Sequence, residues 1–403
     1  MIDFTLDPRL EDIRRRTRDF VDTHILPVEA DRANWDDHDN IADAPLQALR
    51  ARARAAGLWC PQVPQALGGM GLPVTGRAVM YEEANRSIFG PAVFNCAAPD
   101  DGNMDILARV GTPDQQARWL APLVAGAVRS SFVMTEPAPG GGSDPGMIGT
   151  TAVRHGDVWS VTGRKWFITG AEGAAHFILI ARTDPNPDER RRHLTAFLFH
   201  RDQPGWKILR RIAIMGPEEH GGHCELEFDG LEIPDENRLM GVGDGLKVTQ
   251  IRLGTARLTH CMRWLGLAKR AMAEAQAYVD AREGFGIRLA DRESVRLMLG
   301  SVALNIQIGR LLTMNAAWAL DQGSHARKEV SMAKLHVADT LHQAADVAIQ
   351  LNGARGYSRD TVLEWIYRYA RQARLVDGAS EVHRMVLADA YAREGDDFWG
   401  WGA

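Results

Sequence analysis

The sequence predicts an α+β protein in which a helical domain, a small β domain and a helical bundle follow one another along the chain. Two observations predict this order. At both ends, apolar residues recur at the three- and four-residue spacing of a helix. Between them, short apolar runs are bounded by Gly- and Pro-rich turns, as in β structure. We expect the domains to span residues 1–130, 131–240 and 241–403.

The composition is that of an ordinary soluble globular protein. Of the 403 residues, 45% are hydrophobic and 25% are charged, which excludes a disordered chain. The net charge of -5 does not favour binding to a nucleic acid. No run approaches the roughly 20 consecutive apolar residues of a membrane span.

The four cysteines, and the residues at the start of the chain, bear on its compartment. The cysteines are far apart and include no CxxC pair, so the sequence favours reduced thiols over a zinc site or disulfides. The first residues lack the basic start and apolar core of a signal peptide. We therefore expect a cytoplasmic protein. The arginine runs 14–16 and 190–192 are interpreted as solvated surface.

The first domain contains helices separated by Gly and Pro. Leu10, Ile13 and Phe20 follow helical spacing, whereas Gly and Pro in residues 61–73 exclude a regular element. Thr112, followed by Pro and Asp, predicts a helix start.

In the middle domain, the apolar runs 176–181 and 194–199 predict buried strands. Residues 224–229 alternate between apolar and acidic side chains, which predicts a strand with one buried face.

The last domain is predicted to be a bundle. Residues 253–272 carry two apolar stripes, as expected of a helix buried on both sides. Further helices are expected at about 290–322, 327–352 and 360–372.

Four segments, in this order, carry a resemblance to a known family. They are Met134-Thr-Glu-Pro with Gly140-Gly-Gly-Ser-Asp, Val161-Thr-Gly-Arg-Lys-Trp-Phe-Ile-Thr, Arg282-Glu-Gly-Phe-Gly and Val376-Asp-Gly-Ala-Ser-Glu-Val. Together they resemble the signature segments of the acyl-CoA dehydrogenases. Segments 94–104, 220–223, 252–261 and 374–378 resemble the branch that contains family members ten and eleven.

This resemblance implies the fold and the reaction. The fold would be an N-terminal helical domain, a middle β-barrel or sandwich and a C-terminal four-helix bundle. The reaction would be FAD-dependent α,β-dehydrogenation of an acyl-CoA to a trans-2-enoyl-CoA in fatty acid β-oxidation. The electrons would pass to an electron-transfer flavoprotein, and the chain would form a homodimer or homotetramer.

By the same resemblance, Asp377 is the base that takes the proton α to the thioester. Most of the family has glutamate there. We expect desolvation by the acyl chain to raise the pKa of Asp377 toward working pH. Arg257 matches an arginine near the base and could tune the carboxylate or the thioester region. The alternatives are a turn acid or helix N-cap for Asp377 and an exposed helix position for Arg257.

The resemblance also implies two groups of flavin contacts. The first group, around the ring and pyrophosphate, is Phe132, Met134, Thr135, Gly142, Ser143, Phe167 and Thr169. The second group, which would reach the flavin of a neighbouring subunit, is Arg282, Phe285, Gln350, Gly353 and Gly356. The alternative for the aromatic residues is ordinary packing of the β domain.

Two other patterns are discounted. His220 and His223 could be a metal pair, but two glycines between them favour a turn, and no metal is expected. Residues 241–245 resemble a phosphate loop but lack its spacing, so they are interpreted as the entry to a helix.

Two other functions compete with the dehydrogenase. An oxidase of the same fold, similar to nitroalkane oxidase, also uses an aspartate base. A non-catalytic flavoprotein that binds nucleic acid would need a basic surface, which the net charge of -5 argues against. The acyl group, including a 4-hydroxyacyl chain, is left open.

Overall fold

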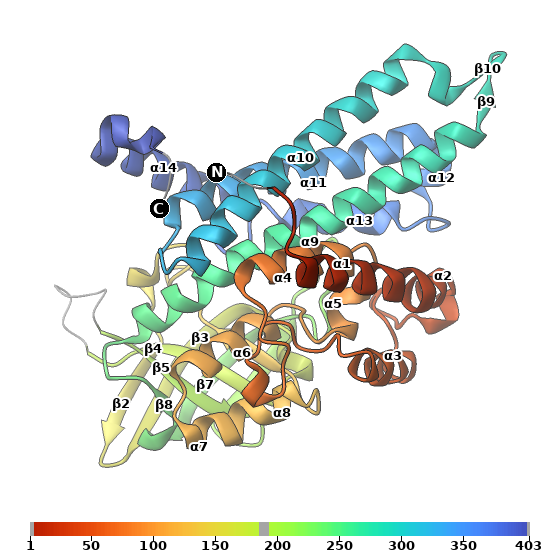
Figure 1. Cartoon of the computed structure of the whole chain (residues 1–403). Helices are drawn as coiled ribbons and strands as arrows, with labels where there is room; N and C mark the ends of the chain where they lie inside the picture. The colour runs from red at the N-terminus through yellow and green to blue at the C-terminus, as the bar shows by residue number, and fades with distance from the viewer. Residues whose placement is uncertain (1–3, 185–192, 401–403) are drawn as a thin grey trace.

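The computed structural model describes residues 4–184 and 193–400. The arginine run 190–192 lies outside the described residues. The chain is arranged as predicted, with helices first, then strands, then a bundle of long helices (Figure 1).

The N-terminal helices lie along one side of α9 (Gly245–Ala281), the longest helix of the described residues (Figure 1). They are α1 (Pro8–Phe20), α2 (Leu26–Ala30), α3 (Asp43–Ala55), α4 (Val74–Ala84), α5 (Gly90–Val93), α6 (Asp100–Val110), α7 (Pro113–Gln115) and α8 (Ala121–Val124). The helix start predicted at Thr112 is confirmed. Its hydroxyl accepts a hydrogen bond from the Gln115 N–H, and the Gln115 side chain accepts one from the Thr112 N–H.

The middle region is one eight-stranded sheet with the order β6-β7-β3-β2-β4-β5-β8 and with β1 beside β4. Its strands are β1 (Ser130–Val133), β2 (Thr151–His155), β3 (Val158–Thr169), β4 (His176–Arg182), β5 (Leu194–His200), β6 (Trp206–Arg211), β7 (His223–Pro234) and β8 (Arg238–Leu239). The three predicted strands are confirmed as β4, β5 and β7. Pairing is antiparallel except for β1 with β4 and β2 with β4.

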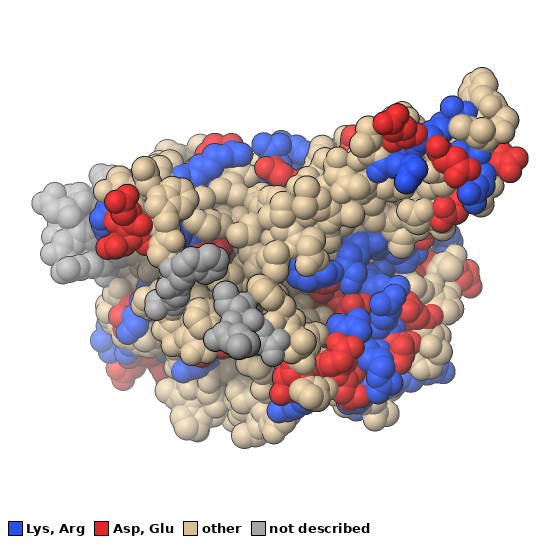
Figure 2. Space-filling model, turned by 45° about the horizontal axis from the view of Figure 1, so that its top comes forward, with Lys and Arg blue, Asp and Glu red and all other residues tan. Residues whose placement is uncertain are grey.

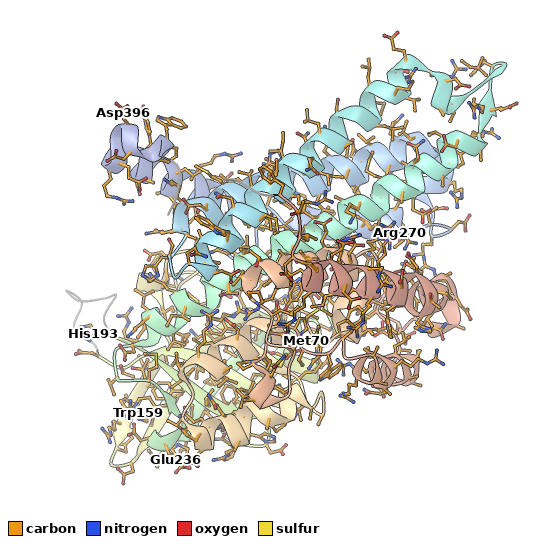
Figure 3. All side chains as sticks on the ribbon, viewed as in Figure 1. Met70, Trp159, His193, Glu236, Arg270 and Asp396 are labelled. Atoms are coloured by element: carbon orange, nitrogen blue, oxygen red, sulfur yellow. The ribbon has the colours of Figure 1, made fainter. Side chains whose placement is uncertain are left out.

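The core of this sheet is aromatic, and it is separate from the helical core. The rings of Phe177 and Phe199 stack 4.5 Å apart across β4 and β5. Trp159 donates a hydrogen bond to Asp235 at 2.7 Å near the outer end of the sheet (Figure 3). This packed core holds β1 and β3, the strands that carry the predicted flavin residues, in fixed positions.

The C-terminal helices form a bundle around α9. They are α9 (Gly245–Ala281), α10 (Glu293–Asp321), α11 (Arg327–Asn352), α12 (Ala354–Tyr357), α13 (Leu363–Gln372) and α14 (Ser380–Glu394), with a hairpin of β9 (Glu283–Gly284) and β10 (Ile287–Arg288) after α9. The predicted second, third and fourth helices are confirmed as α10, α11 and α13. As its two apolar stripes predict, α9 is buried on both sides, because it packs on α4, α6, α10, α11 and α13.

Helix α9 also joins the helical domains to each other. Arg270, labelled in Figure 3, pairs with the buried Glu29 at 3.2 Å. Lys269 donates to Glu82 at 2.8 Å and to Glu83 at 2.9 Å. A residue on the inner face of α9 is therefore held by contacts from two domains.

Helix α10 is exposed along much of its length. By length and composition alone it is the one helix in residues 4–184 and 193–400 that could cross a membrane, and 22% of its most apolar window is buried. A single helix of this kind is weak evidence for a span, and we infer none.

Candidate active site

Asp377 lies in the turn between α13 and α14. Its φ of 52° is in the left-handed region, which is uncommon for a residue with a side chain. Helix α14 begins at Ser380, with Ala379 at the N-cap position, so the alternative that Asp377 caps a helix is wrong. The strained turn points the carboxylate toward the inner face of α9, where its partners lie.

The carboxylate of Asp377 faces nitrogen atoms from α9. His260 Nε2 lies 3.3 Å from Oδ2, and Arg252 Nη1 lies 3.8 Å from Oδ1. Burial raises the pKa of Asp377, but His260, Arg252 and Arg257 outweigh that effect and hold the pKa well below its usual range. In this chain on its own, the expected rise in the pKa of the base is therefore not present.

Arg257 holds the backbone of the same turn rather than the carboxylate. Its Nε donates a hydrogen bond to the Asp377 carbonyl at 2.7 Å. Lys334 on α11 donates to the next carbonyl, that of Gly378, at 2.7 Å. Burial lowers the pKa of Lys334 to about 8, so this lysine is mostly charged at neutral pH. Two cations thus fix the strained backbone, and the alternative of an exposed Arg257 does not hold, since its side chain is partly buried.

His383 closes the other side of the turn. Its Nδ1 lies 3.1 Å from Ser331 Oγ, and a Cβ on Gly378 would lie 3.1 Å from its Nε2. Burial and the charges of Lys334 and Arg257 lower the pKa of His383 to about 4, so it is neutral at pH 7. Glycine fits at 378 because its φ of 103° and this close ring both disfavour a side chain.

Three predicted flavin residues lie at the end of β1 or just after it, and Phe132 is connected to the Asp377 turn through Arg252. The Arg252 guanidinium is 4.6 Å from the centre of the Phe132 ring on β1, so it joins that strand to Asp377. Just after β1, Thr135 Oγ1 donates to the Trp166 carbonyl at 2.7 Å, and the Trp166 N–H donates back to Thr135 O at 3.0 Å. Met134 is buried, and its carbonyl accepts from Lys165 at 2.8 Å. These contacts lock the end of β1 onto β3.

Phe167 and Thr169 stand at the exposed end of β3. Phe167 has a φ of 51° and is 45% exposed, so the alternative that it is packed in the β core is wrong. Thr169 Oγ1 lies 3.1 Å from His223 Nδ1. His220 instead meets the Ile41 carbonyl at 3.2 Å, so the two histidines serve different partners. The chain turns at His220 and Gly221, as predicted, and His223 begins β7.

The glycine-rich segment after β1 is folded tightly, and Ser143 stands at its outer edge. A Cβ on Gly140 would lie 2.3 Å from Glu136 Oε2, and one on Gly141 would lie 2.8 Å from Ile148. A Cβ on Gly142 would meet nothing within 4 Å, and Ser143 is exposed. The backbone at 142–143 is therefore open to a large polar ligand.

The second predicted group lies elsewhere. Arg282 and Phe285 stand at the hairpin beyond α9, and Gln350 and Gly353 at the end of α11, at the tip of the bundle remote from the sheet (Figure 1). Phe285 is fully exposed, and Arg282, Gln350 and Gly353 are exposed too. Within one chain the structure does not bring these residues to Asp377.

Gly356 belongs to the same end but is buried. A Cβ there would lie 2.8 Å from the Asn352 side chain and 2.9 Å from the Ile349 backbone. Packing within the chain is therefore sufficient to explain this glycine.

Family models agree with this geometry over almost the whole chain. The N-terminal, middle and C-terminal domain models of acyl-CoA dehydrogenase match residues 7–127, 131–231 and 243–392. The chain belongs to the acyl-CoA dehydrogenase family. The resemblance described from the sequence is confirmed, and so is the predicted fold class.

Curated relatives match nearly the whole of this chain. It is 36% identical to a probable acyl-CoA dehydrogenase, FadE2, of Mycobacterium tuberculosis, over 96% of this chain and 97% of that protein. It is 34% identical to acyl-CoA dehydrogenase family member 11 of Mus musculus, over 96% of this chain and 50% of the relative. The chain therefore spans half the length of that relative.

Solved structures share the acyl-CoA dehydrogenase fold. A putative acyl-CoA dehydrogenase from Mycobacterium abscessus is 36% identical, with a TM-score of 0.91 over 97% of this chain and 100% of that chain. Butyryl-CoA dehydrogenase from Megasphaera elsdenii is 26% identical, with a TM-score of 0.85 over the same fractions. The family and its fold bind FAD, so the cofactor prediction is confirmed at that level.

The structure places Arg252, His260 and Lys334 around Asp377. None of the three was predicted as a site residue, although Arg252 and His260 lie in segment 252–261, which carries part of the family resemblance. Arg252 and His260 are eight residues apart and so lie on one face of α9. The sequence did contain a signal for Arg252 and His260. The segment of α9 is apolar on two sides, and a charged or imidazole side chain on such a buried helix needs a polar partner.

Proposed function

We propose that this protein is an FAD-dependent acyl-CoA dehydrogenase that converts an acyl-CoA to a trans-2-enoyl-CoA, with Asp377 as the base. One observation carries the proposal. The Asp377 carboxylate is anchored at the strained turn beside α9, and Arg252 connects it to Phe132 on the strand predicted to line the flavin.

The residues present fit a flavin dinucleotide. The Phe167 ring is exposed, and the backbone at Gly142 is open. The Thr135 hydroxyl lies just after β1, and the Thr169 hydroxyl lies at the end of β3. Bound FAD would supply the acceptor for the hydride from the β carbon of the acyl chain. Phe132, Met134, Thr135, Phe167 and Thr169 would hold its ring, and Gly142 and Ser143 its pyrophosphate.

The chain's own part in the reaction is to move one proton. The low pKa of Asp377 keeps its carboxylate ionised at neutral pH, ready to accept the α proton. Such a carboxylate is a weak base, so we expect the bound acyl chain to strengthen it by excluding water. Arg257 and Lys334 fix the turn, and the Asp377 N–H would polarise the thioester carbonyl as in an oxyanion hole.

A homodimer or homotetramer would complete the flavin site. Arg282, Phe285, Gln350, Gly353 and Gly356 lie too far along the bundle to serve the same chain's Asp377, so a second copy would use them. Figure 2 shows few charges over much of the long helical bundle. On α10, Leu297 is 65% exposed and Leu304 is 61% exposed, an arrangement that suits burial against another copy. An electron-transfer flavoprotein would take the electrons, and a cytoplasmic location fits the proposal.

The test is anaerobic titration of the purified protein with a panel of acyl-CoAs of different length, branching and 4-hydroxylation. We expect one class to bleach the visible flavin band and Asp377→Asn to abolish that bleaching, with a rate loss of about 10³-fold or more. Bound flavin that no thioester reduces would contradict the proposal. Oxygen consumption with nitroalkanes would then assign the chain to an oxidase of the same fold.

A further inference from the structure

A continuous set of buried polar contacts leads from the N-terminal domain to Asp377. On α6, Asp101 Oδ2 accepts from Arg263 Nη1 at 2.6 Å and from the Thr259 hydroxyl at 2.9 Å. Arg263 Nη2 lies 3.4 Å from His260 Nδ1. His260 Nε2 lies 3.3 Å from Asp377 Oδ2. His260 is therefore placed between an arginine and the carboxylate of the proposed base.

The arginine decides which ring nitrogen of His260 carries the proton. A guanidinium only donates hydrogen bonds, so Nδ1, which faces Arg263, must be the acceptor. The proton of the neutral imidazole is then on Nε2, the nitrogen that lies 3.3 Å from Asp377 Oδ2. The tautomer is thus assigned from the partners of the ring.

The ring has little freedom to turn. It stacks on Trp264 with centroids 5.1 Å apart and planes 23° apart, and it is 9% exposed. Arg263 is in turn held by its short ion pair with the buried Asp101. The donor at Nε2 is therefore fixed in direction before any substrate arrives.

We propose that His260 is a positioning residue for the reaction: its ring, held by Arg263 and Asp101, donates from Nε2 to Asp377 Oδ2 and sets the orientation in which the carboxylate meets the α proton. This proposal rests on the proposed function. It leaves Oδ1, which has only the Arg252 contact at 3.8 Å, as the oxygen that takes the proton. Sub-ångström control of this kind matters, because about 1 Å of misplacement costs on the order of 100-fold in rate.

Other groups that face Asp377 or His260 act on different atoms. Arg257 and Lys334 hold main-chain carbonyls, and His383 faces Ser331 and Gly378. Tyr369 on α13 faces Arg263 and Trp264 rather than the carboxylate. Within the described residues, the side-chain nitrogens within 4.0 Å of the Asp377 carboxylate oxygens belong to Arg252 and His260 instead.

The first test measures flavin reduction by the acyl-CoA that bleaches the wild-type protein, across a range of pH, in flavin-loaded variants. His260→Leu removes the donor, and we expect reduction at pH 7 to slow by about 10- to 100-fold. The acid limb of its pH profile should move to higher pH, since the ionised carboxylate loses a stabilising contact. His260→Gln keeps a donor at the same reach and should stay within about fivefold of wild type. His342→Leu, on α11 beside Tyr367, is the matched control for loss of a ring.

The second test needs no turnover. In flavin-loaded protein labelled with ¹³C at the aspartate carboxyl carbon, the signal absent from Asp377→Asn reports the ionisation of Asp377. We expect its titration to move to higher pH in His260→Leu and much less in His260→Gln. If His260→Leu does not fold, His260→Asn replaces it, because its shorter amide does not reach Oδ2.

The outcomes separate the inference from the proposed function. If no acyl-CoA reduces the flavin of the wild-type protein, the proposed function is overturned. The carboxyl titration would still test the contact between His260 Nε2 and Asp377 Oδ2. An unchanged rate, pH profile and carboxyl titration in His260→Leu would overturn the inference and leave the dehydrogenase standing. Equal losses in the Leu and Gln variants, with an unmoved carboxyl titration, would reduce His260 to a packing role and also overturn it.

Discussion

Glu136 and Asp377 are both carboxylates surrounded by cations, yet their surroundings differ in one respect. Glu136 receives Lys165 Nζ at 2.9 Å, the Gly149 N–H at 2.7 Å and the Thr150 N–H at 2.9 Å. In the described residues, the Asp377 carboxylate oxygens lie 3.3 Å from His260 Nε2 and 3.8 Å from Arg252 Nη1. In both residues the cations and donors outweigh burial and lower the pKa of the carboxyl.

The direction of the pKa shift therefore does not distinguish the scaffold from the proposed base. What distinguishes the two carboxylates is whether an oxygen is still available to accept a hydrogen bond or a proton. Short hydrogen bonds from fixed backbone and a buried lysine occupy the oxygens of Glu136, which holds the loop between Thr135 and Gly149 in place. The longer contacts of Asp377 orient it but leave an oxygen available to a substrate. The predictions below separate these two roles.

Lys165→Met should have the largest effect on stability. Lys165 is fully buried, and its loss leaves the Glu136 charge without a cation in a dry site. We expect the free energy of unfolding to fall by about 3–5 kcal/mol, measured by urea denaturation at pH 7 with excess FAD. Weaker flavin binding should accompany the loss, because the loop carries Gly142 and Ser143.

The control for this prediction is the double variant Lys165→Met with Glu136→Gln. It removes the unpaired charge and should be more stable than Lys165→Met alone. A double variant that is less stable than the single one would show that the charge is not the cause.

Glu136→Gln alone should have a smaller effect that depends on pH. Since the folded state lowers the pKa of Glu136 from its usual 4.5, the carboxylate stabilises the fold above that pH, and this contribution is lost as the pH falls through the folded value. We expect the variant to be about 2 kcal/mol less stable than wild type at pH 7. The gap should narrow toward pH 3.5 in urea denaturation. A constant gap would mean that Glu136 acts through shape rather than charge.

Sequence patterns could predict the fold and part of the site, for physical reasons. The periodicity of apolar residues predicted α9 and the strands, because burial of one or both faces imposes that periodicity. The helix start at Thr112 was predictable because its capping residues are close together in the sequence. The surroundings of Asp377 come from α6, α9, α11 and α14, and no short motif encodes contacts between such distant segments. The direction of the Asp377 pKa shift was missed for this reason, since it depends on Arg252 and His260.

The remote flavin group is a different case. Arg282 and Phe285 were predicted only from the family resemblance. Within the described residues of one chain, they lie at the tip of the bundle, away from Asp377. Their exposure in the structure is consistent with a role between chains, which a single sequence cannot locate in space.

Thr169→Val should have the smallest effect, and it extends the comparison from carboxylates to hydroxyls. The Thr135 hydroxyl donates to the Trp166 carbonyl and so holds the scaffold together. The Thr169 hydroxyl instead lies 3.1 Å from His223 Nδ1, at the end of β3. Burial lowers the pKa of His223, so the ring is neutral at pH 7 and the Thr169 oxygen keeps a lone pair for a ligand. We expect Thr169→Val to weaken FAD binding about fivefold, near 1 kcal/mol, in a fluorescence titration, with little change in thermal midpoint without FAD. Thr135→Val should lower that midpoint as well as weaken FAD binding, because it also leaves a partly buried carbonyl without its donor. A lowered midpoint in Thr169→Val, or an unchanged midpoint in Thr135→Val, would contradict this distinction between occupied and available polar groups.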